Sequence, residues 1–168
     1  MIIHCSKKLA AKLTDVSPTP LQETSPLGSW HAHLFTIDRR QCAMFCHDAS
    51  RYTLFVPGLR KEHFAALGGG WFRQLYLATL AAFGSPPTQI KKAELVIGPI
   101  CFDTATDRSV QGSLRIARQD LQARVVRVSN VMDLSPVAIS CELSHRPVTI
   151  HGKWLWPDEA MMKVVARL

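Results

Sequence analysis

The stretch that decides the fold is WHAHLFTIDRRQCAMFCHDASRYTLFV, residues 30–56. It contains three runs rich in aromatic, β-branched and other apolar residues, WHAHLFTI, CAMFCHD and YTLFV, which the polar segments DRRQ and ASR separate. Short polar breaks between such runs are typical of antiparallel hairpins. The stretch therefore predicts a three-stranded antiparallel meander.

Helical spacing dominates much of the remaining chain. Apolar residues recur every three or four positions over 60–83 and 110–125, which is the pattern of one helix face. Proline suits the first position of a helix, so two further helices are expected to begin at Pro136 and Pro157. Additional strands are expected at residues 2–5, 95–102 and 148–154.

These elements predict an α+β fold in one domain, residues 1–168. Its sheet is expected to be mainly antiparallel and built on the meander, with helices covering one face. A chain of 168 residues has the length of one ordinary domain and buries enough surface to fold without a metal or a disulfide. Trp30 and Trp71 are expected in the core. Trp154 and Trp156 are also expected to close the core, and stacking on nucleic-acid bases is the alternative for these two.

The net charge of +7 favours polyanionic partners. The excess is spread evenly, however, at +4 over residues 1–84 (nine basic, five acidic) and +3 over residues 85–168 (eleven basic, eight acidic). An even spread is also what solubility alone requires. Charge therefore leaves both a binding role and a purely solubilising role open.

Cysteine usage and the first residues bear on the cellular compartment. The five cysteines are odd in number and lie in apolar surroundings, and the start MIIHCSKKLAAKL has no signal-peptide pattern. No run approaches the ~18 apolar residues of a membrane span. The sequence predicts a cytoplasmic protein without a membrane association.

The meander also predicts a polar patch. If Arg39 and Arg40 form a two-residue loop, His31 faces Asp48 across the hairpin and His33 faces Cys46. Strand alternation then places six side chains on one face, provided that Asp48 pairs with Arg51 across the next turn. They are His31, His33, Cys46, Asp48, Arg51 and Thr53.

Three interpretations of this patch remain open. As a catalytic site of a small hydrolase or phosphoryl-transfer enzyme, His31 is the acid or base, Asp48 orients it and Arg51 holds an anion. As a zinc or iron site, the ligands are His31, His33, Cys46 and Asp48. As a polar sheet end, Asp48 simply pairs with Arg51. The expectation is that the protein holds no metal and no other cofactor.

The helix predicted over 110–125 lies within an arginine-rich segment. Residues 108–127 contain one acidic residue, Asp120, and five arginines, which are Arg108, Arg115, Arg118, Arg124 and Arg127. Guanidinium groups at helical spacing suit bidentate contacts with phosphates. This helix is the candidate surface for nucleic acid or an acidic protein, and a solvated helix face is the alternative.

Several strings occur together in one order: SWHAH (29–33), IDRR (37–40), TDRSVQGS (106–113) and RP (146–147). With them the chain resembles a family of small bacterial proteins classed as a domain of unknown function. The resemblance implies one bacterial cytosolic domain and no activity. The family has Asn at the position of His33 and Met-Asn-Asp where this chain has Leu114-Arg115-Ile116, which weakens the metal interpretation and leaves Arg115 without a role shared by the family.

The sequence thus favours a non-catalytic binding module that uses the arginine-rich helix. The enzyme built on His31, Asp48 and Arg51 is the alternative. The oligomeric state is left open.

Overall fold

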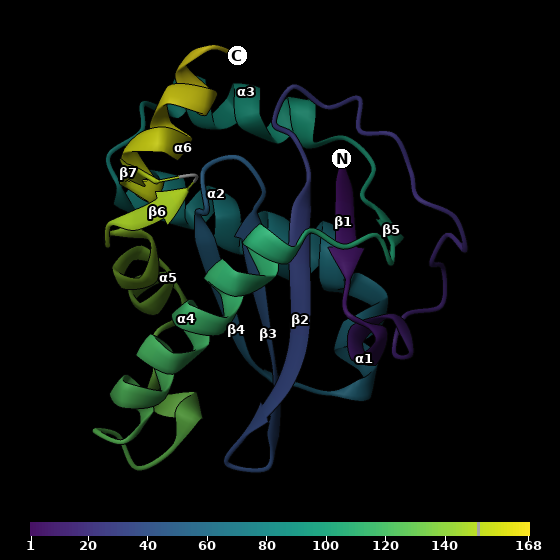
Figure 1. The fold of residues 1–168 in the computed structure, drawn as a ribbon, viewed down its shortest axis with the longest axis vertical. Helices are drawn as coiled ribbons and strands as arrows, with labels where there is room; N and C mark the ends of the chain where they lie inside the picture. Colours follow the sequence, from purple (N-terminus) through teal and green to yellow (C-terminus); the bar gives the residue numbers. More distant parts are fainter. Residues whose placement is uncertain (151) are drawn as a thin grey trace.

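A five-stranded mixed sheet forms the centre of the molecule, in the strand order β4-β3-β2-β1-β5 (Figure 1). The computed structural model describes residues 1–150 and 152–168. The strands are β1 (Ile2–Cys5), β2 (Trp30–Ile37), β3 (Arg40–His47), β4 (Thr53–Leu59) and β5 (Cys101–Asp103). The predicted meander is confirmed as β2, β3 and β4, which pair antiparallel. Beside it, β1 runs parallel to both β2 and β5.

The β2–β3 hairpin turns one residue earlier than predicted. Its loop consists of Asp38 and Arg39, both with positive φ (47° and 61°), and Ile37 pairs with Arg40. Aspartate tolerates positive φ better than arginine does, which favours this loop over Arg39-Arg40. His31 therefore lies opposite Cys46, and His33 opposite Met44. The register moves by two residues, so each side chain keeps its predicted face.

The predicted α+β fold with its meander is confirmed, with one difference: helices cover both faces of the sheet and not one face only. One core lies beneath α2 (Arg73–Ala82), α3 (Pro87–Ile97) and α6 (Pro157–Ala166), and a second beneath α4 (Arg108–Val125) and α5 (Pro136–Ser144). Figure 1 shows α4 crossing in front of β2–β4 and α2 behind them. The cause is that β3 is apolar on both sides, with Ala43 and Phe45 in the first core and Cys42, Met44 and Cys46 in the second.

The segment over 60–83 is irregular at its start. A 3-10 turn (Lys61–Ala66) and a π-helical turn (Leu67–Phe72) precede α2. Three glycines, residues 68–70, lie in the π-helical turn, as expected for a segment with low helix propensity. A short helix, α1 (Lys7–Ala10), follows β1, and a 3-10 turn (Val131–Asp133) precedes α5.

Other expectations are confirmed only in part. The strand predicted over 95–102 is wrong in extent, because α3 continues to Ile97 and β5 spans only three residues. The extended segment 148–154 forms β6 (Val148–Ile150) and β7 (Lys153–Leu155), and residue 151 lies outside the described residues. Of the tryptophans only Trp30 is buried, whereas Trp71, Trp154 and Trp156 are 41%, 75% and 40% exposed. Within the described ranges, no helix is both long and apolar enough to cross a bilayer.

Candidate functional site

His31 and Asp48 contact each other, as the sequence predicts. They are diagonal neighbours across the hairpin and not directly opposite each other. His31 Nδ1 lies 2.7 Å from Asp48 Oδ1, and Ser29 Oγ donates to Asp48 Oδ2 over 2.7 Å. Asp48 follows the end of β3, where its backbone N–H donates to the carbonyl of Ser29. The chain bend after β3 therefore returns the carboxylate to the start of β2, although Cys46 is the residue opposite His31.

The second ring nitrogen of His31 also has a partner. The backbone N–H of Asp107, the N-cap residue of α4, donates to His31 Nε2 over 2.9 Å. Nε2 is then an acceptor, so Nδ1 carries the proton and donates to Asp48. His31 is only 4% exposed. Both of its nitrogens are thus occupied in joining the sheet to the start of α4.

Arg51 lies near this pair but does not form the predicted contact with Asp48 among the described residues. It is 5% exposed, and its Nη2 donates to Ser109 Oγ in the first turn of α4 over 2.9 Å. Its Nε and Nη1 have no hydrogen-bond partner within the described part of the chain. Arg51 therefore holds the β3–β4 loop against α4, and its backbone has a positive φ of 61°.

A second histidine–aspartate pair, which the sequence did not predict, lies beside the first. His4 Nδ1 is 2.5 Å from Asp103 Oδ1, and the two residues are direct partners in the parallel β1–β5 pairing. On its other side His4 is the register partner of His31, with ring centroids 4.8 Å apart. The sequence around His4 and around Asp103 gives only a weak signal for this pair, because the long-range pairing of β1 with β5 brings the two residues together.

Asp103 is anchored by backbone groups as well as by His4. It is fully buried, and it accepts hydrogen bonds from the backbone N–H groups of Leu21 and Ala105 over 2.8 Å and 3.0 Å. Burial by itself raises the pKa of Asp103, but these hydrogen bonds and that of His4 outweigh it, so the net pKa is lowered. The pKa of Asp48 is lowered in the same way, since the hydrogen bonds of His31 and Ser29 outweigh burial.

These lowered pKa values predict that stability is lost in acid. A carboxyl group whose pKa is lower in the folded state stabilises the protein above its unfolded pKa of about 3.9, and that stabilisation is lost as the pH falls through the folded value. We expect the contribution of these two carboxyl groups to the free energy of urea unfolding to be level above about pH 5 and to decline below about pH 4. Burial also lowers the pKa values of His33 and His47, and these histidines add a decline that begins near their unfolded pKa of about 6.5. Asp103→Asn should flatten part of the decline below about pH 4.

The control for this prediction is Asp15→Asn, a change at an exposed aspartate in the loop after α1. It should leave the acid-side decline unchanged. A decline of the same size in wild type and Asp103→Asn would contradict the role of Asp103.

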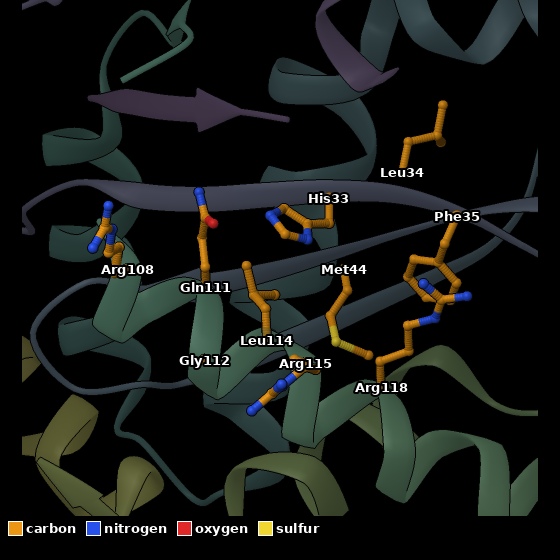
Figure 2. Close-up of a pocket in the computed structure, with 10 residues that line it drawn as sticks. All are labelled: His33, Leu34, Phe35, Met44, Arg108, Gln111, Gly112, Leu114, Arg115 and Arg118. Carbon is orange, nitrogen blue, oxygen red and sulfur yellow. The ribbon is translucent and has the colours of Figure 1, made fainter. Parts of the chain in front are cut away.

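A pocket opens between α4 and the sheet, beyond the end of β1 (Figure 2). Its volume is about 480 Å³. In Figure 2 the side chains of α4 face those of β2 and β3 across this space. The lining residues are His33, Leu34, Phe35, Met44, Arg108, Gln111, Gly112, Leu114, Arg115 and Arg118.

The pocket is cationic and has an apolar floor. Arg108, Arg115 and Arg118 are exposed, and none forms a salt bridge with a described residue. The Arg118 guanidinium lies 4.8 Å from the ring centroid of Phe35. Burial, together with the charges of His31 and Arg118, lowers the pKa of His33, which keeps its ring neutral near pH 7. The lining residues include no carboxylate.

The other two arginines of the predicted set do not belong to the pocket. Arg124 Nε lies 2.5 Å from Glu142 Oε2 on α5, which neutralises its charge locally. Arg127 is exposed beyond the end of α4. The five-arginine surface predicted from the sequence is thus divided into three pocket arginines and two that lie elsewhere.

Gly112 lines the pocket from the second turn of α4. Glycine inside a helix costs about 1 kcal/mol relative to alanine. A Cβ built at this position would meet no described atom within 4 Å, so packing does not require glycine there. The missing side chain instead keeps this wall of the pocket open.

The residues of the metal hypothesis do not converge. Among the residues that the structure describes, no three His, Cys, Asp or Glu side chains form a group able to hold a metal ion. His33 faces the arginine pocket, opposite Met44. Cys46 is fully buried, and burial raises the pKa of its thiol to about 12. Cys101 is exposed, although its sequence surroundings are apolar.

Comparison with known proteins identifies a family but no activity. The model of a family described as Domain of unknown function (DUF6933) matches residues 2–160, which agrees with the resemblance seen in the sequence. No curated protein matches the chain, and neither does any solved structure.

Proposed function

Because the chain belongs to the DUF6933 family, which carries no assigned activity, we propose a function from the site itself: the protein binds single-stranded nucleic acid, with its phosphates on Arg108, Arg115 and Arg118. The observation that carries the proposal is that these three guanidinium groups, which form no salt bridge with a described residue, line one pocket with no carboxylate among its lining residues. Guanidinium groups without a protein counterion are suited to bidentate contacts with phosphate oxygens.

The shape of the pocket favours a single strand over a duplex. About 480 Å³ is the volume of a small-molecule site and accommodates one unstacked base with its sugar. The floor contains Phe35, Met44 and Leu114, and the guanidinium of Arg118 offers a flat cationic surface. Unstacked bases bind to such aromatic, apolar and guanidinium surfaces, whereas a duplex keeps its bases stacked inside.

We further propose that the protein acts in the bacterial cytoplasm. All five cysteines are free thiols, in keeping with a reducing compartment. An acidic protein as the partner of the pocket is the competing possibility, and the binding experiment separates the two.

Fluorescence anisotropy with a labelled single-stranded RNA of about ten nucleotides tests the proposal at about 50 mM salt. Relative to wild type, the triple variant Arg108→Ala/Arg115→Ala/Arg118→Ala should bind on the order of 100-fold more weakly. Its slope of log K against log salt should be shallower by about 2, because each phosphate contact with a single strand contributes about 0.7. Gly112→Leu should also weaken binding, because the leucine fills the pocket.

The matched control removes three positive charges from the opposite side of the sheet: Lys91→Ala/Lys92→Ala/Lys163→Ala. These lysines are exposed on α3 and α6. The control should bind RNA within a few-fold of wild type. If both triple variants lose affinity equally, or if wild type binds poly-glutamate and not RNA, the proposal is wrong.

A further inference from the structure

Of the two histidines in the His4–Asp103 and His31–Asp48 pairs, His4 has one ring nitrogen without a hydrogen-bond partner among the described residues. Its Nδ1 is bound to Asp103, and its Nε2 lies 3.9 Å from Asp48 Oδ2, beyond the range of a hydrogen bond. By contrast, both ring nitrogens of His31 have partners. The side chain of His4 is 12% exposed, so part of it is open to solvent.

Asp103 fixes the tautomer and the orientation of the His4 imidazole. The carboxylate is buried, anchored by two backbone N–H groups, and ionised because its pKa is lowered. An ionised acceptor at Nδ1 keeps the proton on that nitrogen and leaves the lone pair on Nε2. It also stabilises the imidazolium that forms when Nε2 takes a proton. A histidine oriented in this way is equipped for general base catalysis.

A chain of contacts connects His4 with the start of α4, where the arginine pocket begins. His31 is the neighbour of His4 across the sheet, and its Nε2 accepts the N–H of Asp107, the residue before Arg108. His33, which lines the pocket, follows two residues along the same face of β2, a distance of about 7 Å. For a ribose to reach His4, a strand bound with a phosphate on Arg108 has to extend from the start of α4 across His31.

From this juxtaposition we infer that the protein cleaves RNA, with His4 as the general base. The inference rests on the proposed binding of a single strand. His4 Nε2 takes the proton of a ribose 2′-hydroxyl, and the 2′-oxygen forms a bond to the adjacent phosphorus. The bond from phosphorus to the 5′-oxygen breaks, and that oxygen leaves with the bonding electron pair and takes a proton from water. The His4 imidazolium returns its proton to the hydroxide, and the products are a 2′,3′-cyclic phosphate and a 5′-hydroxyl.

This chemistry uses only groups that the site, the RNA and water supply. The attacking hydroxyl is already attached next to the phosphorus, so its effective concentration is high. The pocket guanidiniums stabilise the extra negative charge that develops on the phosphate oxygens. DNA lacks the 2′-hydroxyl, so the same site binds a DNA strand without cleaving it.

The test follows cleavage of an end-labelled RNA by purified full-length protein on a denaturing gel, with mass spectrometry of the products. Wild type should release fragments ending in a 2′,3′-cyclic phosphate. A substrate that carries 2′-O-methyl groups throughout should bind and stay intact. His4→Gln should cleave RNA at least on the order of 100-fold more slowly than wild type. Asp103→Asn should also lose cleavage activity.

The matched control is His145→Gln. His145 also forms a pair with an aspartate, since its Nδ1 lies 2.6 Å from Asp158 Oδ2, but it is exposed at the end of α5 and does not line the pocket. This variant should cleave at the wild-type rate. The 2′-O-methyl substrate tests the chemistry without any change to the protein, so the result does not depend on the folding of a variant.

The outcomes also separate this inference from the proposed function. If wild type binds RNA with the expected dependence on the pocket arginines but leaves it intact, the cleavage inference is wrong and the binding function stands. If RNA does not bind, the proposed function itself fails. Equal cleavage by wild type and His4→Gln would overturn the role of His4.

Discussion

Trp30→Ala is expected to lower the free energy of unfolding by about 3–5 kcal/mol, the cost of truncating a large aromatic side chain in a packed core. Trp30 is 1% exposed and opens β2 beneath the helices of the first core. Its ring centroid lies 4.9 Å from that of Phe72, 5.5 Å from Tyr76 and 5.1 Å from His47. Alanine would leave a cavity that these rings cannot close, because the sheet and α2 hold their backbones apart.

Urea unfolding followed by circular dichroism measures this loss. Trp154→Ala provides the control, since Trp154 is 75% exposed and its truncation should change the free energy by no more than about 0.5 kcal/mol. A loss below about 1 kcal/mol for Trp30→Ala would show that the first core is not organised around this residue.

The second large loss of stability is expected on replacement of two buried serines of α5. Ser140 Oγ accepts the backbone N–H of Phe55 over 2.9 Å, and Ser144 Oγ accepts that of Thr53 over 3.0 Å. Strand β4 is an edge of the sheet, so these N–H groups have no strand partner on that side. The serine side chains thus replace the missing strand, and they also block further pairing at this edge.

Ser140→Ala/Ser144→Ala would leave two buried N–H groups without a partner. Each unsatisfied group costs about 1–3 kcal/mol, so the double variant should lose about 2–6 kcal/mol of the free energy of unfolding. Chemical denaturation measures the loss, and size-exclusion chromatography should show more self-association as the edge is released.

Ser113→Ala is the matched control, because Ser113 Oγ donates only to the carbonyl of Ser109 within α4 at an exposed position. It should change the stability by no more than about 0.5 kcal/mol. A double serine variant as stable as wild type would mean that water satisfies the edge of β4 as well as the serines do.

The candidate site was predictable only where it depends on neighbours along the chain. His31 lies in β2 and Asp48 directly follows β3, so both belong to one hairpin, and strand alternation with an assumed loop placed them on one face. The arginines of α4 could be assigned to a helix face from their spacing, but the Glu142 that neutralises Arg124 comes from a different helix. Asp103 approaches His4 from 99 residues away, and no local pattern marks that contact.

The sequence by itself determined the meander, the arginine-rich helix and the apolar faces of most helices, because these depend on periodicity within about ten to twenty residues. Tertiary structure decided the parallel pairing of β1 with β2 and β5, the covering of both sheet faces, and the exposure of Trp71 and Trp154. Parallel strands need long crossover connections, so their partners leave no turn signal in the sequence. The candidate site depends on both. Its elements β2 and α4 follow from local sequence patterns, whereas only the packing of distant segments places His4 and Asp103 beside them.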